Sequence, residues 1–321
     1  MENGILKTHM HKKNNSIAFI SSPFQLLCLK EFIEEKKIKT ITINFIQVNK
    51  SEENVKQINL TAKFLGLEII KNFYIKKFKL NYVNYLLMFF LKKVNFLVVG
   101  SHFNSHFVFL SRIIRFKNLF ILDDGIATIM IGENQKKLIA RSFTHNLYPK
   151  NRIYFTLFKS NNLKNFIINN FTYTKNLIYQ KKYKNVVIIL GGPLAEGNFV
   201  SHKEYESFIL NIKNKFSDKT LHYLPHRLEN INKLSKLNLE IDQSNFGFEI
   251  YLALNEFLPK IIIGFYSTAL ITTKILLKND KNVRIFNYEI ESLNQNYDWH
   301  LQSLLFEKYD IEKFNTKLEY S

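Results

Sequence analysis

Cysteine is almost missing from this chain of 321 residues, which carries Cys28 alone. A single cysteine excludes an internal disulfide and a cysteine-based zinc site, and it is typical of a protein from a reducing compartment. Cys28 stands within an apolar helical pattern, so we expect a buried structural thiol instead of a nucleophile.

Long hydrophobic runs are missing too. No stretch reaches the roughly 18 apolar residues that cross a bilayer, and the basic segment 1–15 lacks the apolar core of a signal peptide. The nearest candidate, 82–91, is apolar between flanking lysines. It predicts a buried helix, with a helix in a membrane interface as the alternative. We therefore expect a cytoplasmic protein, and peripheral attachment to the inner face of the cytoplasmic membrane stays open.

Acidic residues are outnumbered, since 27 Asp and Glu stand against 45 Lys and Arg, a formal net charge of +18. This excess implies an anionic partner: a nucleotide-sugar, nucleic acid or an anionic membrane surface. A nucleic-acid-binding protein would gather basic and aromatic side chains on one face. The lysines here are scattered along the chain, so we expect no nucleic acid and keep it as the alternative.

Hydrophobic residues, at 46% of the chain, suffice for two cores, and 321 residues exceed the roughly 100–200 of a single domain. Strand patterns alternate with helix patterns over 16–122 and again from residue 185 onward. This alternation predicts parallel sheets with helices on both faces. We expect an α/β fold of the GT-B kind, in which two Rossmann-like domains face each other across a cleft.

The domain boundary is expected near residue 155 or somewhat later, which gives domains 1–155 and 156–321. The segment 141–184 is rich in Asn, Lys, Phe and Tyr with weak periodicity. We expect it to hold the linker and peripheral helices.

The stretch 219–227, KTLHYLPHR, predicts a short strand that stops at Pro225 and leaves His226 and Arg227 at its carboxyl end. Ligands of open α/β sheets bind at that end. A titratable donor beside a planar cation suits a phosphate leaving group. The alternative is a solvated surface loop.

Asp123, Asp124 and Gly125 directly follow the apolar run 119–122. Adjacent residues leaving a strand point opposite ways, so one carboxylate can face a ligand while the other holds the loop. This favours a single general base over a metal pair. The alternative is a helix N-cap with an acid in the first turn.

Two further strand ends carry small or hydroxyl residues. Gly191, Gly192 and Pro193 follow NVVIIL, where a backbone could approach a ligand closely, although an ordinary tight turn explains them equally. Ser267 and Thr268 open an apolar helix, which makes a phosphate site or an N-cap without ligand.

Glu249 stands among apolar residues in FGFEIYL. A carboxylate in such surroundings should pair with a cation or accept hydrogen bonds from sugar hydroxyls.

These motifs follow one another in a fixed order. They are SSPFQLL, LDDG, GGPLAEG, YLPHR, FGFEIYL and IIIGFYSTAL. In this order the sequence resembles the bacterial sialyltransferases, above all glycosyltransferase family 52, the lipooligosaccharide and capsule group. It is also similar to related families with D/E-D-G, HP-type and paired-hydroxyl motifs. The resemblance spans Ser22 to about Leu276, and it departs from the HP motif because Pro225 precedes His226.

The resemblance implies metal-independent, inverting transfer of sialic acid from CMP-sialic acid to a sugar hydroxyl, such as that of galactose, in a lipooligosaccharide, O-antigen or capsule glycan. Transfer of another CMP-activated acid, such as Kdo, legionaminic or pseudaminic acid, or the extension of a polysialic acid chain, is the alternative. It implies no cofactor. Asp124 or Asp123 would be the base, with Glu196 or Glu204 as alternatives. His226 would donate a proton to the departing phosphate, or form a hydrogen bond with it.

The resemblance also implies an acceptor-side first domain and a second domain that binds the CMP-sugar. The implied substrate-binding residues are Ser22, Gln25, Gly125, Gly191, Gly192, Pro193, Pro225, Arg227, Glu249, Ser267 and Thr268. Among them, Ser267 and Thr268 would hold the phosphate and Glu249 the ribose. The oligomeric state stays open, a homodimer included.

Overall fold

The fold is taken from a computed structural model. It describes residues 15–47, 52–74, 87, 89–90, 92–125, 128, 148–158, 165–230, 232, 234, 237, 239–242, 244–278, 280–294 and 297–314. These residues form two compact units, each built on its own sheet.

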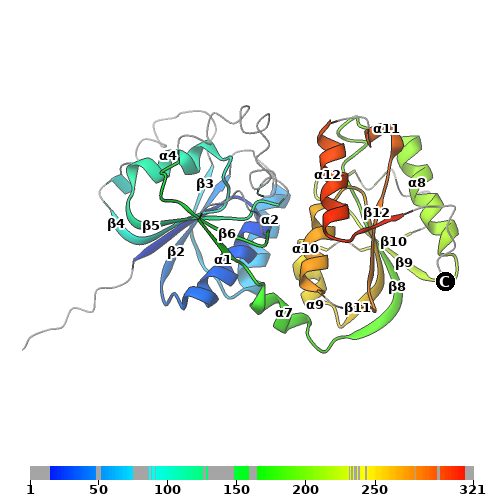
Figure 1. The fold of residues 1–321 in the computed structure, drawn as a ribbon, viewed down its shortest axis with the longest axis horizontal. Helices are drawn as coiled ribbons and strands as arrows, with labels where there is room; N and C mark the ends of the chain where they lie inside the picture. Colours follow the sequence, from blue (N-terminus) through cyan, green and yellow to red (C-terminus); the bar gives the residue numbers. More distant parts are fainter. Residues whose placement is uncertain are drawn as a thin grey trace, which may run out of the picture. The chain divides into compact units, whose positions relative to one another are not determined.

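The first unit holds a seven-stranded sheet in the order β3-β2-β1-β4-β5-β6-β7 (Figure 1). Every pairing in it is parallel. Its strands are β1 (Ser16–Ile20), β2 (Ile41–Gln47), β3 (Ile69–Tyr74), β4 (Lys93–Val99), β5 (Arg115–Leu122), β6 (Ile153–Thr156) and β7 (Phe166–Ile168).

Two helices of this unit pack on opposite faces of the sheet (Figure 1). Helix α1 (Pro23–Lys36) places Phe32 against the rings of Phe96, Phe120 and Phe155. Helix α4 (Ser105–Ile113) contributes to the other core cluster, which includes Ile17, Phe19 and Ile121. Both faces of the sheet are therefore covered by apolar side chains, as expected of a parallel sheet that lies between helices.

The second unit holds a six-stranded sheet in the order β10-β9-β8-β11-β12-β13, again with parallel pairings throughout. Its strands are β8 (Lys182–Leu190), β9 (Thr220–Leu224), β10 (Glu240–Ile241), β11 (Phe257–Gly264), β12 (Arg284–Tyr288) and β13 (Glu312–Phe314). The helices that follow or precede them are α7 (Thr172–Ile178), α8 (His202–Lys215), α9 (Phe248–Leu254), α10 (Thr268–Leu276), α11 (Glu291–Asn294) and α12 (Tyr297–Lys308). This strand order is the Rossmann order, which confirms the predicted α/β, GT-B-like class.

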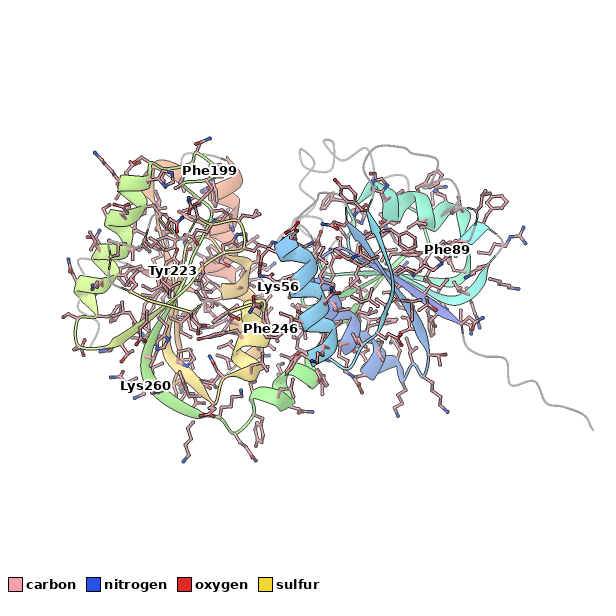
Figure 2. All side chains as sticks on the ribbon, turned by 180° about the vertical axis from the view of Figure 1, so that it is seen from behind. Lys56, Phe89, Phe199, Tyr223, Phe246 and Lys260 are labelled. Atoms are coloured by element: carbon pink, nitrogen blue, oxygen red, sulfur yellow. The ribbon has the colours of Figure 1, made fainter. Side chains whose placement is uncertain are left out.

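One helix from the first half of the chain belongs to the second unit. Contacts group α2 (Glu52–Phe64) with residues 170–321 and group 65–169 with the first unit. The ring of Phe64 lies 6.2 Å from that of Phe246, and Figure 2 shows Phe246 beside α2. The chain therefore passes between the units at 50–51, 64–65 and 169–170.

The segment 141–184, expected to hold a linker and helices, contains helix α7 and the passage between the units at 169–170, and it contributes strands as well. Its described residues include β6 and β7, which extend the first sheet, and the start of β8. The runs IYFT and FII are too short to display an alternation of period two. Contacts group 65–169 with the first unit and 170–321 with the second.

None of the helices in the described part of the chain has the length and apolar character of a bilayer span. Most of the stretch 82–91 lies outside the described residues.

Candidate functional site

Each sheet has one point where the strand order reverses and the carboxyl ends of neighbouring strands diverge. In the first unit this point lies between β1 and β4, and in the second between β8 and β11. Ligands of open α/β sheets bind there. Most of the residues predicted from the sequence follow the carboxyl ends of strands, whereas Glu204 and Glu249 lie in helices α8 and α9.

Asp123 holds the first unit together instead of facing a ligand. Its side chain is fully buried, and Oδ2 accepts a hydrogen bond of 2.6 Å from the Leu157 backbone N–H. Burial raises the pKa of Asp123 to about 7, because hydrogen bonds only partly offset the loss of water around the charge. The carboxyl thus joins the loop after β5 to the loop after β6.

Asp124 is the carboxylate of the pair that solvent reaches. Its Oδ1 accepts a hydrogen bond of 2.7 Å from Gln25 Nε2, and its backbone N–H donates to Thr128 Oγ1 at 2.9 Å. Gln25 is buried, and its Oε1 accepts from the Ser21 N–H at 2.7 Å. Because both ends of the Gln25 amide are engaged, Gln25 orients Asp124 through Oδ1, and Oδ2 takes no part in that contact.

Ser22 and Gly125 have local structural roles. Ser22 caps α1, with its side chain accepting from the Gln25 N–H at 3.3 Å. Gly125 adopts φ +69° directly after Asp124, a conformation that favours glycine. Their proposed contacts with substrate stay predictions.

His102 was not predicted from the sequence. It follows β4 at the carboxyl edge of the sheet, the edge at which Asp124 also lies. Arg152 Nε donates to the Tyr154 hydroxyl at 2.9 Å, and that hydroxyl shares a hydrogen bond of 2.9 Å with His102 Nδ1, in which either group can be the donor. The signal was available, because Gly100-Ser101-His102 ends a strand at the reversal point.

In the second unit, both glycines of the β8 turn have engaged N–H groups. Gly191 donates to the Leu224 carbonyl at 2.8 Å, and Gly192 donates to the Tyr205 hydroxyl at 2.9 Å. Pro193 has no N–H to offer. The turn can therefore lie against a ligand, but it offers no donor from these three residues to a phosphate.

A buried network connects this turn to the His226 loop, and the sequence reading missed it. Tyr205 donates to the Tyr223 hydroxyl at 2.9 Å, and Tyr223 donates to Glu229 Oε1 at 2.5 Å. The other carboxylate oxygen of Glu229 accepts from the His226 backbone N–H at 3.0 Å. Glu229 thus holds the His226 loop against the carboxyl end of β8.

His226 is neutral near pH 7. Burial, and secondly the positive charge of Arg227, lower its pKa to about 4, while Glu196 opposes them. Its Nδ1 accepts from the Leu228 N–H at 3.2 Å, so Nε2 carries the proton. His226 is therefore suited to donate a hydrogen bond to an anion, which is one of the two roles expected for it.

The start of α10 has donors available to a ligand. Ser267 caps the helix by accepting from the Ala269 N–H at 3.3 Å. No hydrogen bond is described for the Ser267 N–H, the Thr268 N–H or the Thr268 hydroxyl within the described residues. The preceding Tyr266 adopts φ +52°, an uncommon value for an aromatic residue, so the turn that presents these donors is strained.

Glu249 lies beside the same helix. It is buried, its Oε1 accepts from the Thr272 hydroxyl at 2.5 Å, and burial raises its pKa. Thr272 stands one turn into α10. A carboxyl group is thereby fixed against α10, one turn from the donors of Ser267 and Thr268.

The remaining candidates have contacts within the fold. Arg227 is exposed, and its guanidinium donates to Asn54 Oδ1 of α2 at 3.0 Å, while Pro225 ends β9. Glu196 accepts from the Asn230 N–H at 2.9 Å.

Glu204 forms a capping box with Ser201 at the start of α8. Hydrogen bonds from the Ser201 N–H and hydroxyl lower the pKa of Glu204. Helix capping therefore accounts for Glu204 without catalysis.

The described residues contain no group of three or more His, Cys, Asp or Glu side chains placed to hold a metal ion. The metal independence and the lack of a cofactor expected from the sequence stay predictions.

Comparison with solved structures bears on the fold. The UDP-GlcNAc 2-epimerase of Methanocaldococcus jannaschii, solved with UDP-GlcNAc and UDP, matches with a TM-score of 0.54 and 14% identity, over 85% of this chain and 83% of its own. A Listeria monocytogenes protein assigned as a UDP-N-acetylglucosamine 2-epimerase matches with a TM-score of 0.52 and 9% identity, over 93% and 88%. No protein-family model and no curated protein matches the chain.

These findings correct one expectation. The predicted membership of the sialyltransferases, glycosyltransferase family 52 above all, was wrong, since both solved structures reported above are assigned as UDP-GlcNAc 2-epimerases and no family model matches. The motifs that carried the resemblance are short and stand at strand ends. A GT-B-like fold of any family collects glycines, hydroxyls and acids at such positions, because ligands bind there.

Proposed function

We propose that this chain is an enzyme acting on a nucleotide-activated sugar, and that its second unit binds the nucleotide. The observation that carries the proposal is the set of donors at the start of α10, beside the buried Glu249, at the reversal point of a Rossmann-ordered sheet. The similarity to epimerases of a UDP-sugar supports the same class of ligand.

The phosphates would lie at the start of α10. The Ser267 and Thr268 N–H groups and the Thr268 hydroxyl supply hydrogen bonds, and the positive end of the helix dipole favours an anion. His226 would donate from Nε2, since it is neutral in the free protein. These donors stabilise the negative charge that grows on the phosphate when its bond to the sugar breaks.

The ribose would bind at Glu249. Its carboxyl accepts from the Thr272 hydroxyl and from its own backbone N–H, and two carboxylate oxygens have lone pairs for further donors. Ribose hydroxyls are donors of the kind that a buried carboxylate oxygen needs.

In the first unit, Asp124 is the proposed reacting carboxylate and Gln25 its positioning residue. Asp124 keeps one oxygen outside the Gln25 contact, whereas Asp123 is buried and bound to Leu157. A base must reach the proton that it removes, which favours Asp124.

Calorimetric titration with UDP, UDP-GlcNAc, GDP and CMP tests nucleotide binding. Glu249→Ala should weaken binding of the preferred nucleotide by on the order of tenfold or more, because it removes a hydrogen bond to a charged group. His226→Ala should lower turnover by on the order of a hundredfold, and His226→Gln, whose amide nitrogen can replace Nε2–H, should restore part of it.

Nuclear magnetic resonance of the products then separates the reactions. An altered sugar configuration would assign epimerisation, and nucleotide release that depends on an added sugar acceptor would assign transfer. Absence of binding by all four nucleotides, with the wild type folded, would refute the proposal. Binding that Glu249→Ala leaves unchanged would refute the assigned site.

A further inference from the structure

The positive charge of the chain is concentrated in one segment. From Ile69 to Leu122 the sequence has no aspartate or glutamate but seven lysines and two arginines. These nine positive charges equal half of the net charge of +18, within about a sixth of the chain. A stretch so uniform in sign indicates an anionic partner.

Four of the described basic residues of this segment lie at the amino ends of β4 and β5. Lys93 is the register partner of Arg115, and the Arg115 N–H donates to the Lys92 carbonyl at 3.3 Å. We call Lys92, Lys93, Arg115 and Lys117 the basic edge. All four are exposed, and among the described residues none forms an ion pair.

Like charges opposite each other on neighbouring strands are destabilising. The basic edge therefore holds unfavourable charge that an external anion would relieve. It lies at the amino edge of the first sheet, whereas Asp124 lies at the carboxyl edge.

Large apolar side chains are exposed beside the basic edge. Leu87 is 63% exposed and Phe90 55%, although Phe89 between them is buried in the core cluster. The Lys92 N–H donates to the Phe89 carbonyl, and the Lys92 ammonium lies 5.2 Å from the Phe89 ring. Exposed apolar side chains thus stand within a few residues of the basic edge in the sequence.

Helix α4 adds to the same layer. Its Phe107 and Leu110 belong to the core cluster that contains Phe89, so both segments cover the same face of the sheet (Figure 2 labels Phe89). Phe109 points away from that cluster and is 42% exposed.

We propose that this face of the first unit docks on an anionic lipid membrane. Leu87, Phe90 and Phe109 enter the interface, and the basic edge binds lipid phosphates. Bulky apolar side chains flanked by lysines are the pattern of interfacial attachment. Leu87, the most exposed of the three, is aliphatic and offers no ring on which a nucleobase could stack, which favours lipid over nucleic acid. The inference is independent of the proposed activity.

Cosedimentation with vesicles tests the proposal. The full chain should bind phosphatidylcholine vesicles containing 30% phosphatidylglycerol and should bind pure phosphatidylcholine weakly, with ~30% chosen as a typical anionic content. Lys92→Glu with Lys93→Glu should reduce the partition coefficient by on the order of tenfold or more, since each basic residue near the surface contributes to binding. Leu87→Ser with Phe90→Ser should reduce it similarly.

Matched control variants carry the same kinds of substitution, lysine to glutamate and apolar residue to serine, in the second unit. Lys260→Glu with Lys281→Glu, and Leu210→Ser with Leu304→Ser, alter exposed residues of the second unit and should retain most of the binding. Circular dichroism and melting temperature verify that every variant is folded.

Three results would overturn the proposal: no binding to anionic vesicles, equal losses in patch and control variants, or binding to a single-stranded oligonucleotide that the vesicles do not compete with.

Discussion

Asp123 and Asp124 are neighbours with different environments. The alternation of side chains along a strand predicted that one carboxylate would hold a loop and the other would face a ligand, which fits the buried Asp123 and the half-buried Asp124. Which residue takes which place could not be predicted, because it depends on Leu157 and Gln25, partners distant in sequence.

The raised pKa of Asp123 predicts a pH-dependent stability. The folded value of about 7 exceeds the ordinary 3.8, so between these pH values the folded state holds a proton that the unfolded state has released. Stability should therefore fall as pH rises from about 4 to 7, by about 4 kcal/mol in total at 1.36 kcal/mol per pKa unit. Asp123→Asn should lack this slope and should match or exceed the wild type at pH 8.

Urea denaturation from pH 4 to 8 measures the difference. Asp124→Asn is the control, because it leaves Asp123 in place and removes only the smallest of the causes that shift the pKa of Asp123, so most of the slope should remain. An equal slope in wild type and Asp123→Asn would show that another group titrates.

At the scale of elements, local chemistry made the longer elements predictable and the short ones not. Caps at Ser22 and Ser267 and continuous apolar runs marked α1, α10 and β8. The strands β10 and β13 are two and three residues long and partly exposed, so their pairing depends on the neighbouring strand alone.

The β8 turn offers a matched pair of substitutions. A Cβ at Gly191 would lie 2.2 Å from Glu229 Oε2 and 2.5 Å from the Tyr223 hydroxyl, whereas at Gly192 the nearest atoms are 3.5 Å and 3.6 Å away. Gly191→Ala should therefore break the buried network and cost about 1–3 kcal/mol of unfolding free energy, as overpacking does. Gly192→Ala should cost less than about 1 kcal/mol.

Urea denaturation of both variants at one pH measures these losses. Equal losses would show that the network does not require a glycine at residue 191.

At the scale of the molecule, the division into two sheets was predictable and the path of the chain between them was not. Helix α2 has the pattern of an ordinary crossover helix between β2 and β3. Its membership of the second unit depends on Asn54 with Arg227 and Phe64 with Phe246. Contacts between residues so far apart leave no sign in local periodicity.

The path of α2 predicts a pattern of hydrogen exchange. Because Asn54 of α2 binds Arg227, next to His226, nucleotide binding in the second unit should slow amide exchange in α2 together with the loop after β9. Strands β2 and β3, which flank α2 in sequence, should change less. Mass spectrometry with and without the preferred nucleotide measures this, and protection of β2 and β3 equal to that of α2 would contradict it.

The membership of α2 also has a consequence for biosynthesis. Asn54 leaves the ribosome 173 residues before its partner Arg227, which at 5–20 residues per second is a delay of roughly ten seconds or more. Throughout that interval the residues that α2 packs against have not yet been synthesised. A chaperone that shields α2 would therefore raise the yield of folded protein.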